Sequence, residues 1–223
     1  LQLPPLAVTA VGSMPRPTWL CTVHRNDVEW HLQGDALQEG QIDAIRLAAA
    51  DQARAGLDVV TDGEQRREHF IMYFCRRTGG FDNENLKEKT YRAGRSRAAL
   101  PQIVGPITWN GPISVEDYRL AAESTGRPVK MAVPGPLTIW DTTYDSYYND
   151  PKAVGFAWAE AINQELKALV DAGCQFVQID EPAFTRYPEM VHDWAVEALD
   201  RALDGIDVLT AVHLCYGYAA VSA

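Results

Sequence analysis

Short apolar runs of five or six residues recur along the chain and alternate with longer stretches that are apolar on one side only. The runs have the continuous hydrophobic character of buried parallel strands, and the longer stretches have the spacing of surface helices. Together they indicate a parallel α/β architecture, in which helices pack on the sheet. Six strands are predicted on this basis, at residues 6–11, 57–61, 102–107, 129–133, 175–179 and 208–212.

The helical pattern is strongest at residues 35–55, 151–172 and 191–203. Gly56 and Gly173 directly follow the first two of these segments, and glycine is a typical residue at the end of a helix. Residues 19–33 are predicted to form a loop. Residues 79–100 carry mixed charge without apolar periodicity, so we expect an excursion or a mobile loop there, within a single domain that spans residues 1–223.

Composition narrows the range of functions. The 223 residues are 47% hydrophobic, and 30 acidic against 20 basic residues give a net charge of −10. This charge argues against a nucleic-acid or anionic-membrane surface. The sequence shows neither a signal-peptide pattern nor an apolar run long enough to span a bilayer, so we expect a cytoplasmic protein. Its four scattered cysteines are better interpreted as free thiols or metal ligands than as disulfides.

Unusual polar residues follow the predicted strands. Gly12 and Ser13 come after the first strand, in a turn that is either a cradle for an anionic group or an ordinary connection. After the second strand, Glu64 and Arg66 are candidate substrate contacts. Arg67 and Glu68 are interpreted there as the solvated start of a helix.

The fifth strand ends in two adjacent carboxylates, Asp180 and Glu181. Neighbouring side chains on a strand point to opposite faces, so only one of them can face the interior of a barrel. We expect Asp180 to contact a substrate amine and Glu181 to hold its loop through hydrogen bonds. The sixth strand leads into His213 and Cys215, which an extended backbone would place on one face. They are either two zinc ligands or a buried histidine and a buried cysteine that happen to lie close together.

Candidate chemistry at the ends of successive strands is the arrangement of a (β/α)8 TIM barrel. A doubly wound open sheet is the competing fold, but it commonly carries a glycine-rich phosphate loop, and the sequence has neither of the standard patterns. We therefore predict a (β/α)8 barrel. About six of its eight βα units are accounted for, so the barrel is expected to be incomplete at the C-terminus.

Five motifs, in order, resemble those of the catalytic C-terminal barrel of the cobalamin-independent methionine synthase family. They are Val11-Gly12-Ser13-Met14-Pro15, Asp62-Gly63-Glu64, Pro134-Gly135-Pro136-Leu137-Thr138, Gln178-Ile179-Asp180-Glu181-Pro182 and His213-Leu214-Cys215-Tyr216. The resemblance implies a barrel that transfers a methyl group to the zinc-bound thiolate of homocysteine, giving methionine. The implied methyl donor is a methylated folate, such as methyltetrahydrofolate, or a corrinoid, such as methylcobalamin.

The resemblance also implies residue roles. Gly12 and Ser13 would hold the amino-acid carboxylate, Glu64 and Asp180 would bind the ammonium group as substrate-binding and catalytic residues, and His213 and Cys215 would bind zinc. The family's other two zinc ligands, a carboxylate and a cysteine, come from later strands and are absent here. We therefore expect either a longer protein or a partner subunit or dimer that closes the barrel.

Two alternatives stay open at this stage. One is a related zinc barrel enzyme that acts on another thiol, and the other is a non-catalytic barrel remnant that binds a protein partner. For a folate donor, Trp109 and Trp140 are candidates to line an aromatic slot. The aromatic stretch 140–148 is either the wall of such a pocket or a surface loop.

Overall fold

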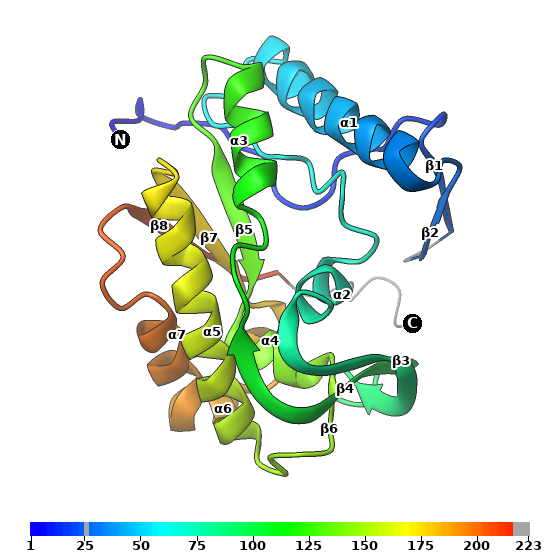
Figure 1. Ribbon diagram of the computed structural model, residues 1–223. Helices are drawn as coiled ribbons and strands as arrows, with labels where there is room; N and C mark the ends of the chain where they lie inside the picture. The colour runs from blue at the N-terminus through cyan, green and yellow to red at the C-terminus, as the bar shows by residue number, and fades with distance from the viewer. Residues whose placement is uncertain (25–26, 216–223) are drawn as a thin grey trace.

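The computed structural model describes residues 1–24 and 27–215, and a set of parallel strands lies at its centre (Figure 1). Three of them form one sheet in the order β5 (Lys130–Pro134), β7 (Phe176–Asp180) and β8 (Leu209–His213). Parallel bridges add two further segments beside β5, because Thr9 pairs with Val59 and Val60 pairs with Val129. Among the described residues, the parallel segments are thus neighbours in the order in which they occur along the chain, as a barrel requires.

Residues 102–107 form a strand, as predicted, but this strand is not part of the parallel arc, so its expected place as the third barrel strand was wrong. It belongs to β4 (Ser96–Trp109), which pairs antiparallel with β3 (Thr78–Tyr91) and parallel with β6 (Tyr144–Asp145). The loop predicted at 79–100 is also mostly strand, in a β3–β4 ribbon that curls away from the central sheet (Figure 1). Most of β3 is exposed or half-buried, so its strand residues have no need of apolar alternation.

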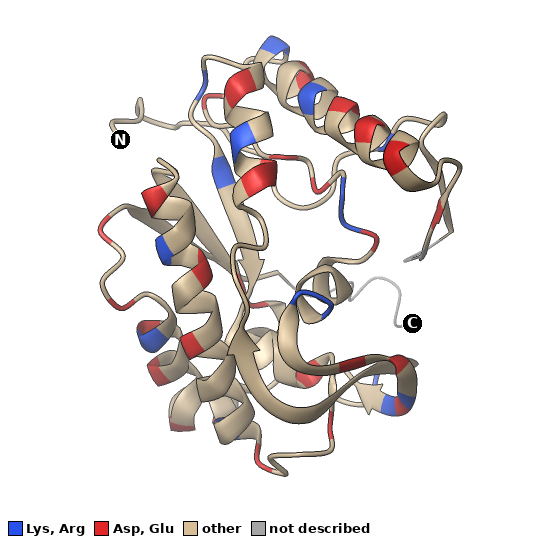
Figure 2. Ribbon diagram, viewed as in Figure 1, with Lys and Arg blue, Asp and Glu red and all other residues tan. Residues whose placement is uncertain are grey.

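The three predicted helical regions are confirmed, the last of them in three short pieces. They are α1 (Gly34–Arg54), α5 (Pro151–Asp171), and the series α6 (Pro188–Met190), η2 (Val191–Ala195) and α7 (Val196–Ala202). The helix α2 (Phe70–Cys75) begins close to the helix start expected at Arg67 and Glu68, but the pattern did not predict α3 (Val115–Ser124), α4 (Pro136–Asp141) or η1 (Pro182–Thr185). Within the predicted loop 19–33, β1 (Cys21–His24) and β2 (Asp27–Trp30) form a hairpin. Both signs of charge occur along α1, α3 and α5, as on helices whose outer faces meet water (Figure 2).

The central sheet has an apolar face and a polar face. Met131, Val133, Val177 and Ile179 alternate along β5 and β7 and belong to the buried core. Trp158 of α5 packs in the same core, and its indole Nε1 donates a hydrogen bond to the carbonyl of Pro134 at 2.8 Å. This face is the one that the helices cover.

The opposite face of the sheet carries polar side chains. Lys130 and Gln178 lie on it and are buried. Asp180 at the end of β7 is paired in register with His213 at the end of β8, so these two side chains share that face. The polar residues that the sequence placed at strand ends therefore meet on one side of the sheet.

Apolar side chains are exposed on both outer strands of the arc. Leu6 is 96% exposed and Val8 is 54% exposed beside the first segment, while Leu209 and Val212 are 40% and 39% exposed on β8. The sheets of the described residues are open rather than closed into a complete barrel. In this part of the chain, no helix combines the length and the apolar character needed to cross a membrane.

Candidate active site

The loop that follows the second parallel segment adopts an unusual backbone. Gly63 and Glu64 both have positive φ, at 62° and 54°, and this conformation is strained for a glutamate. Hydrogen bonds hold it in place: Glu64 N–H donates to the Asp62 carboxylate at 3.2 Å, and the Arg16 guanidinium donates to the Glu64 carbonyl at 2.9 Å. The loop is thus fixed from both sides, and the Glu64 side chain is only 6% exposed.

Ser13 and Glu64, predicted to act together, are in direct contact. The Ser13 hydroxyl donates to Glu64 Oε2 at 2.5 Å, and Met14 N–H donates to the Gly63 carbonyl at 3.0 Å. Gly12 has a φ of 78°, which turns the chain toward this contact. A hydroxyl has one proton to donate, so while Ser13 orients Glu64 it cannot also donate to a substrate carboxylate.

Arg67 is a central residue of the site that the sequence analysis missed. It is 1% exposed, and its guanidinium lies 3.2 Å from Asp62 Oδ2 and 3.6 Å from Glu64 Oε1 while donating to the Ala132 carbonyl at 3.0 Å. Burial lowers its pKa, but the carboxylates of Asp62 and Glu64 outweigh that effect and raise the pKa above its ordinary value. The interpretation of Arg67 as a solvated helix start was wrong. The spacing of Asp62 and Glu64 before it was the available signal.

Arg66, the arginine proposed for substrate contact, is bound elsewhere. Its guanidinium pairs with Glu116 at 2.6 Å and with the buried Asp117 at 3.0 Å, both on α3. Tyr73 also donates to Asp117, at 2.6 Å. Arg66 therefore ties the loop to α3 in this structure.

Asp180 lies where the other charged groups converge. It is 7% exposed and accepts a hydrogen bond from Gln178 Nε2 at 2.6 Å. Burial and the nearby Glu64 carboxylate raise the Asp180 pKa to about 6, whereas the Gln178 hydrogen bond, His213 and Arg67 act to lower it. Because Glu64, His213 and Arg67 all act on Asp180 electrostatically, the structure brings together predicted residues from three different strand ends.

Glu181 has a structural role through hydrogen bonds, as predicted, but these bonds hold the start of α4 rather than the loop of Glu181 itself. Its fully buried carboxylate accepts hydrogen bonds from the backbone N–H groups of Leu137 and Thr138 and from the Thr138 hydroxyl, at 2.7–3.0 Å. Burial raises its pKa to about 7 despite these bonds. A Cβ on Gly135 would lie 2.3 Å from the Glu181 carboxyl carbon, so glycine is needed there. Close packing and hydrogen bonds thus hold the Pro-Gly-Pro motif and the Asp-Glu-Pro motif together.

His213 and Cys215 are the last two predicted site residues. His213 ends β8, and Cys215 follows two residues later; both are half-buried. Their nitrogen and sulfur donors suit zinc, but two donors make only half of a tetrahedral zinc shell. No three His, Cys, Asp or Glu side chains in residues 1–24 and 27–215 are arranged to hold a metal ion. Their role as zinc ligands therefore stays a prediction, and Tyr216 of the same motif lies outside the described residues.

The two tryptophans considered for a cofactor slot are engaged in packing or hydrogen bonds. Trp109 Nε1 donates to Glu165 at 3.0 Å. Trp140 packs edge-on against Tyr187, with ring centroids 5.3 Å apart, and Lys89 Nζ lies 4.8 Å from its ring. These contacts favour a structural role for both rings.

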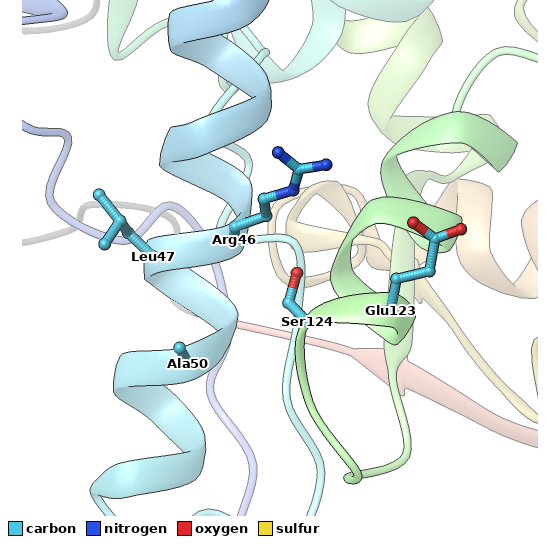
Figure 3. A pocket seen from close by; sticks show the side chains of 5 residues that line it. All are labelled: Arg46, Leu47, Ala50, Glu123 and Ser124. Carbon is cyan, nitrogen blue, oxygen red and sulfur yellow. The ribbon is translucent and has the colours of Figure 1, made fainter.

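Two surface hollows can be compared as routes to these residues. One, of about 540 Å³, begins at Ser13 and extends along the following turn to β1; its lining is Ser13, Met14, Pro15, Arg16, Thr18, Cys21, Thr22 and Val23. The other, of about 470 Å³, lies between α1 and α3 and is lined by Arg46, Leu47, Ala50, Glu123 and Ser124 (Figure 3). Only the first contains a predicted site residue, so it is the better candidate for access to the site.

Fold and site together define an α/β protein with a buried acid–base cluster at the carboxyl ends of parallel strands, the usual location of an active site in such folds. The family described as the cobalamin-independent synthase catalytic domain matches residues 6–221. The chain belongs to this family of cobalamin-independent methionine synthases.

Known proteins support this assignment. The chain is 37% identical over 221 residues to methionine synthase of Saccharolobus solfataricus and 35% identical over 221 residues to that of Sulfurisphaera tokodaii. Each alignment covers 97% of this chain, but only 64% and 63% of the respective relative. The chain thus spans a little less than two thirds of the length of these relatives.

Solved structures agree with the fold. A B12-independent methionine synthase from a Shewanella species, in complex with selenomethionine, superposes with a TM-score of 0.91 at 40% identity, covering 96% of this chain and 62% of that one. A structure described as the putative vitamin-B12 independent methionine synthase from Listeria monocytogenes has a TM-score of 0.67 at 20% identity, over 82% of this chain and 57% of that one. The second likeness supports the fold alone.

Proposed function

We propose that this chain forms the amino-acid-binding part of an enzyme that transfers a methyl group to the thiol of homocysteine, giving methionine. The contact between Ser13 and Glu64, beside the buried Asp180, is the observation that carries the proposal. It joins residues from separate strand ends into one acidic cluster. Membership of the methionine synthase family indicates homocysteine as the substrate, and the Shewanella relative was solved with selenomethionine, an analogue of the proposed product.

In the proposed complex, the substrate ammonium lies between Glu64 and Asp180. Two buried carboxylates bind an ammonium well through charge-assisted hydrogen bonds. Its positive charge would offset the burial of Asp180 and the repulsion from Glu64, which together raise the Asp180 pKa. Ser13 orients Glu64 through its hydroxyl, and the backbone of Gly12 and Ser13 is the proposed contact for the substrate carboxylate. These residues bind and position the amino acid so that its thiol lies in line with the methyl donor.

We also propose that zinc binds at the end of β8, with His213 and Cys215 as two of its ligands. The proposal rests on their donor chemistry, on their place beside Asp180 and on the family. Bound zinc would supply acidity, keeping the substrate thiol in its nucleophilic thiolate form at neutral pH. The remaining ligands would come from outside the described residues.

The described arc is proposed to be part of a (β/α)8 barrel. Exposed apolar side chains on its two outer strands, together with the greater length of the relatives, support this. Measuring the intact mass and the unfolding of the natural protein tests the idea. A stable monomer of 24.7 kDa would contradict it.

The function itself is tested by ligand binding and methyl transfer with the full-length protein. Calorimetric titration should show that L-homocysteine binds and that 4-mercaptobutyrate, which lacks the ammonium, binds at least about tenfold more weakly. Glu64→Gln should remove most of this difference, whereas Glu68→Gln, a nearby partly exposed carboxylate paired with Arg76, should leave it intact. Assays with methyltetrahydrofolate and with methylcobalamin then identify the donor. No homocysteine binding by the zinc-loaded protein would overturn the proposal.

A further inference from the structure

Lys130 is a buried cation that the proposed chemistry does not use. It lies on the polar face of β5 and is 2% exposed. Its ammonium Nζ donates to the Ala10 carbonyl at 3.0 Å and to Gln178 Oε1 at 2.7 Å, and it lies 5.6 Å from the centroid of the Phe176 ring. Both of these hydrogen-bond acceptors are neutral, so neither bond brings a carboxylate to the buried charge.

A cation in this position costs stability. Burial lowers the pKa of Lys130, which shows that the surroundings disfavour its charged form, although Asp180 acts in the opposite direction. An apolar side chain of similar length would fill the same space without that penalty. The cost suggests that Lys130 serves something other than packing.

The hydrogen bonds of Gln178 indicate the role of Lys130. An ammonium group can only donate, so the Gln178 atom that faces Lys130 must be the carbonyl oxygen. The amide nitrogen then necessarily faces the other way, where it donates to Asp180 Oδ1 at 2.6 Å. If the amide were flipped, two donors would meet at Lys130 and two acceptors at Asp180.

We infer that Lys130 is a positioning residue for amino-acid binding: through Gln178 it fixes the orientation of the Asp180 carboxylate toward the substrate ammonium. This inference rests on the proposed function. Because Gln178 occupies Oδ1, Asp180 Oδ2 is left to face the ligand. The anchor at Ala10 ties the same relay to the first parallel segment, two residues before Gly12.

A chain of three groups thus ends at the substrate. Lys130 fixes the orientation of the Gln178 amide, and this amide fixes the orientation of the Asp180 carboxylate. The carboxylate then binds the substrate ammonium. Loss of either of the first two members should weaken binding only of ligands that carry an ammonium group, because the effect passes through that contact alone.

The test compares three variants of the full-length protein. Lys130→Met keeps the length of the side chain but removes its charge, Gln178→Leu removes both bonds of the amide, and Gln178→Glu keeps an acceptor for Lys130 but cannot donate to Asp180 when ionised. Each should raise KM for L-homocysteine about tenfold with kcat changed much less. Binding of 4-mercaptobutyrate should stay within about twofold of wild type, because that ligand lacks the ammonium.

Controls separate this effect from general destabilisation. Asn163 is buried and donates to the Ala202 and Asp204 carbonyls, remote in the fold from the strand ends. Asn163→Ala should lower the unfolding temperature without changing the preference for homocysteine over 4-mercaptobutyrate. In the double variant Lys130→Met, Gln178→Leu, the KM for L-homocysteine should rise no more than in either single variant. Both substitutions act through the same series of hydrogen bonds.

The outcomes distinguish this inference from the function on which it rests. If wild type binds homocysteine no better than 4-mercaptobutyrate, the proposed amino-acid site is wrong. If wild type prefers homocysteine and Lys130→Met keeps the same preference while remaining folded, the site stands and the inference about Lys130 is overturned. An equal loss for both ligands would also overturn it, because that result indicates a purely structural role.

Discussion

The hydroxyl of Ser13 donates a hydrogen bond of 2.5 Å to the carboxylate of Glu64, although 51 residues separate them in the sequence. The bond joins the turns after the first two parallel segments. Since Glu64 is held at positive φ in a buried loop, its carboxylate has little freedom once Ser13 is in place. This hydrogen bond gives Ser13 a specific role in the turn, which distinguishes the turn from an ordinary connection between elements.

Replacing Ser13 should therefore weaken ligand binding more than folding. We expect Ser13→Ala to raise the Kd for L-homocysteine about tenfold, since a hydrogen bond to a charged group is lost. The Ser13 side chain is exposed but its acceptor Glu64 is buried, so the free energy of unfolding should fall by about 1 kcal/mol, less than the loss in binding. Calorimetric titration and urea unfolding measure the two effects. Thr18→Val, in the same hollow, is the control and should bind normally; equal affinity in both variants would refute the role of Ser13.

Arg67 should be the most sensitive charged residue for stability. Arg67→Met leaves the carboxylates of Asp62 and Glu64 buried without their cation, which costs about 3–5 kcal/mol in comparable cases. Arg76→Met removes an ion pair with Glu68 in which the arginine is 48% exposed, and should cost less than about 1 kcal/mol. Urea unfolding of the two variants gives the comparison. A similar loss of unfolding free energy in the two variants would show that the buried ion pairs of Arg67 contribute no more to stability than the exposed pair of Arg76.

The sequence predicted the positions of the strand ends well because each apolar run is followed by residues that cannot continue a buried strand. Gly12 and Glu64 are examples, and both lie at the predicted edge. Alternation along a strand also predicted that Asp180 and Glu181 point to opposite faces. Asp180 lies on the polar face beside Gln178, and Glu181 points toward α4. Local pattern was sufficient to place these strand ends.

The sequence pattern did not predict which strands pair or which charged side chains are buried. Residues 102–107 are apolar enough for a barrel strand, yet they pair with β3, because an apolar run does not specify its neighbour. Arg67 looked solvated because charged residues surround it in sequence, and the folded loop shows that Asp62 and Glu64 pair with it in the interior. The first error concerns a contact between distant segments, and the second concerns the folding of a single loop onto its own charged residues.

Gly135 should tolerate no side chain. In Gly135→Ala the new Cβ would meet the Glu181 side chain at 2.3–2.5 Å, so either this side chain or α4 must move. We expect a loss of about 1–3 kcal/mol in the free energy of unfolding, together with weaker binding of homocysteine because Asp180 adjoins Glu181. Gly126→Ala is the matched control, since no described atom lies within 4 Å of the position that its Cβ would take. Thermal unfolding should shift only in the first variant; an unshifted Gly135→Ala would contradict the close packing.

Zinc content tests the pair at the end of β8. In the full-length protein, His213→Ala and Cys215→Ser should each reduce bound zinc below one equivalent after dialysis, because one donor of a tetrahedral shell is lost. His192→Ala and Cys75→Ala change the same residue types in η2 and α2 and should retain the metal. Elemental analysis measures the content. Full zinc occupancy in both β8 variants would exclude the pair as ligands.

Asp117 should make stability depend on pH in the mildly acidic range. It is fully buried, and burial, together with the nearby Asp62, raises its pKa from 3.8 to about 6 against the opposing effects of Tyr73 and Arg66. A carboxyl whose pKa is raised on folding favours the folded state when protonated. Its contribution is therefore fully present below about pH 4 and is lost as the pH rises toward 6.

Asp117→Asn mimics the protonated form at every pH and removes this dependence. The free energy of unfolding of wild type, measured relative to this variant, should fall by up to about 3 kcal/mol between pH 4 and pH 6, because groups common to both proteins cancel. Glu116→Gln removes the exposed carboxylate that binds the same Arg66 and should leave the slope unchanged. Urea unfolding at half-unit pH intervals gives the curves. If wild type and Asp117→Asn run parallel across this range, Asp117 is ionised in the fold, and its pairing with Arg66 outweighs its burial.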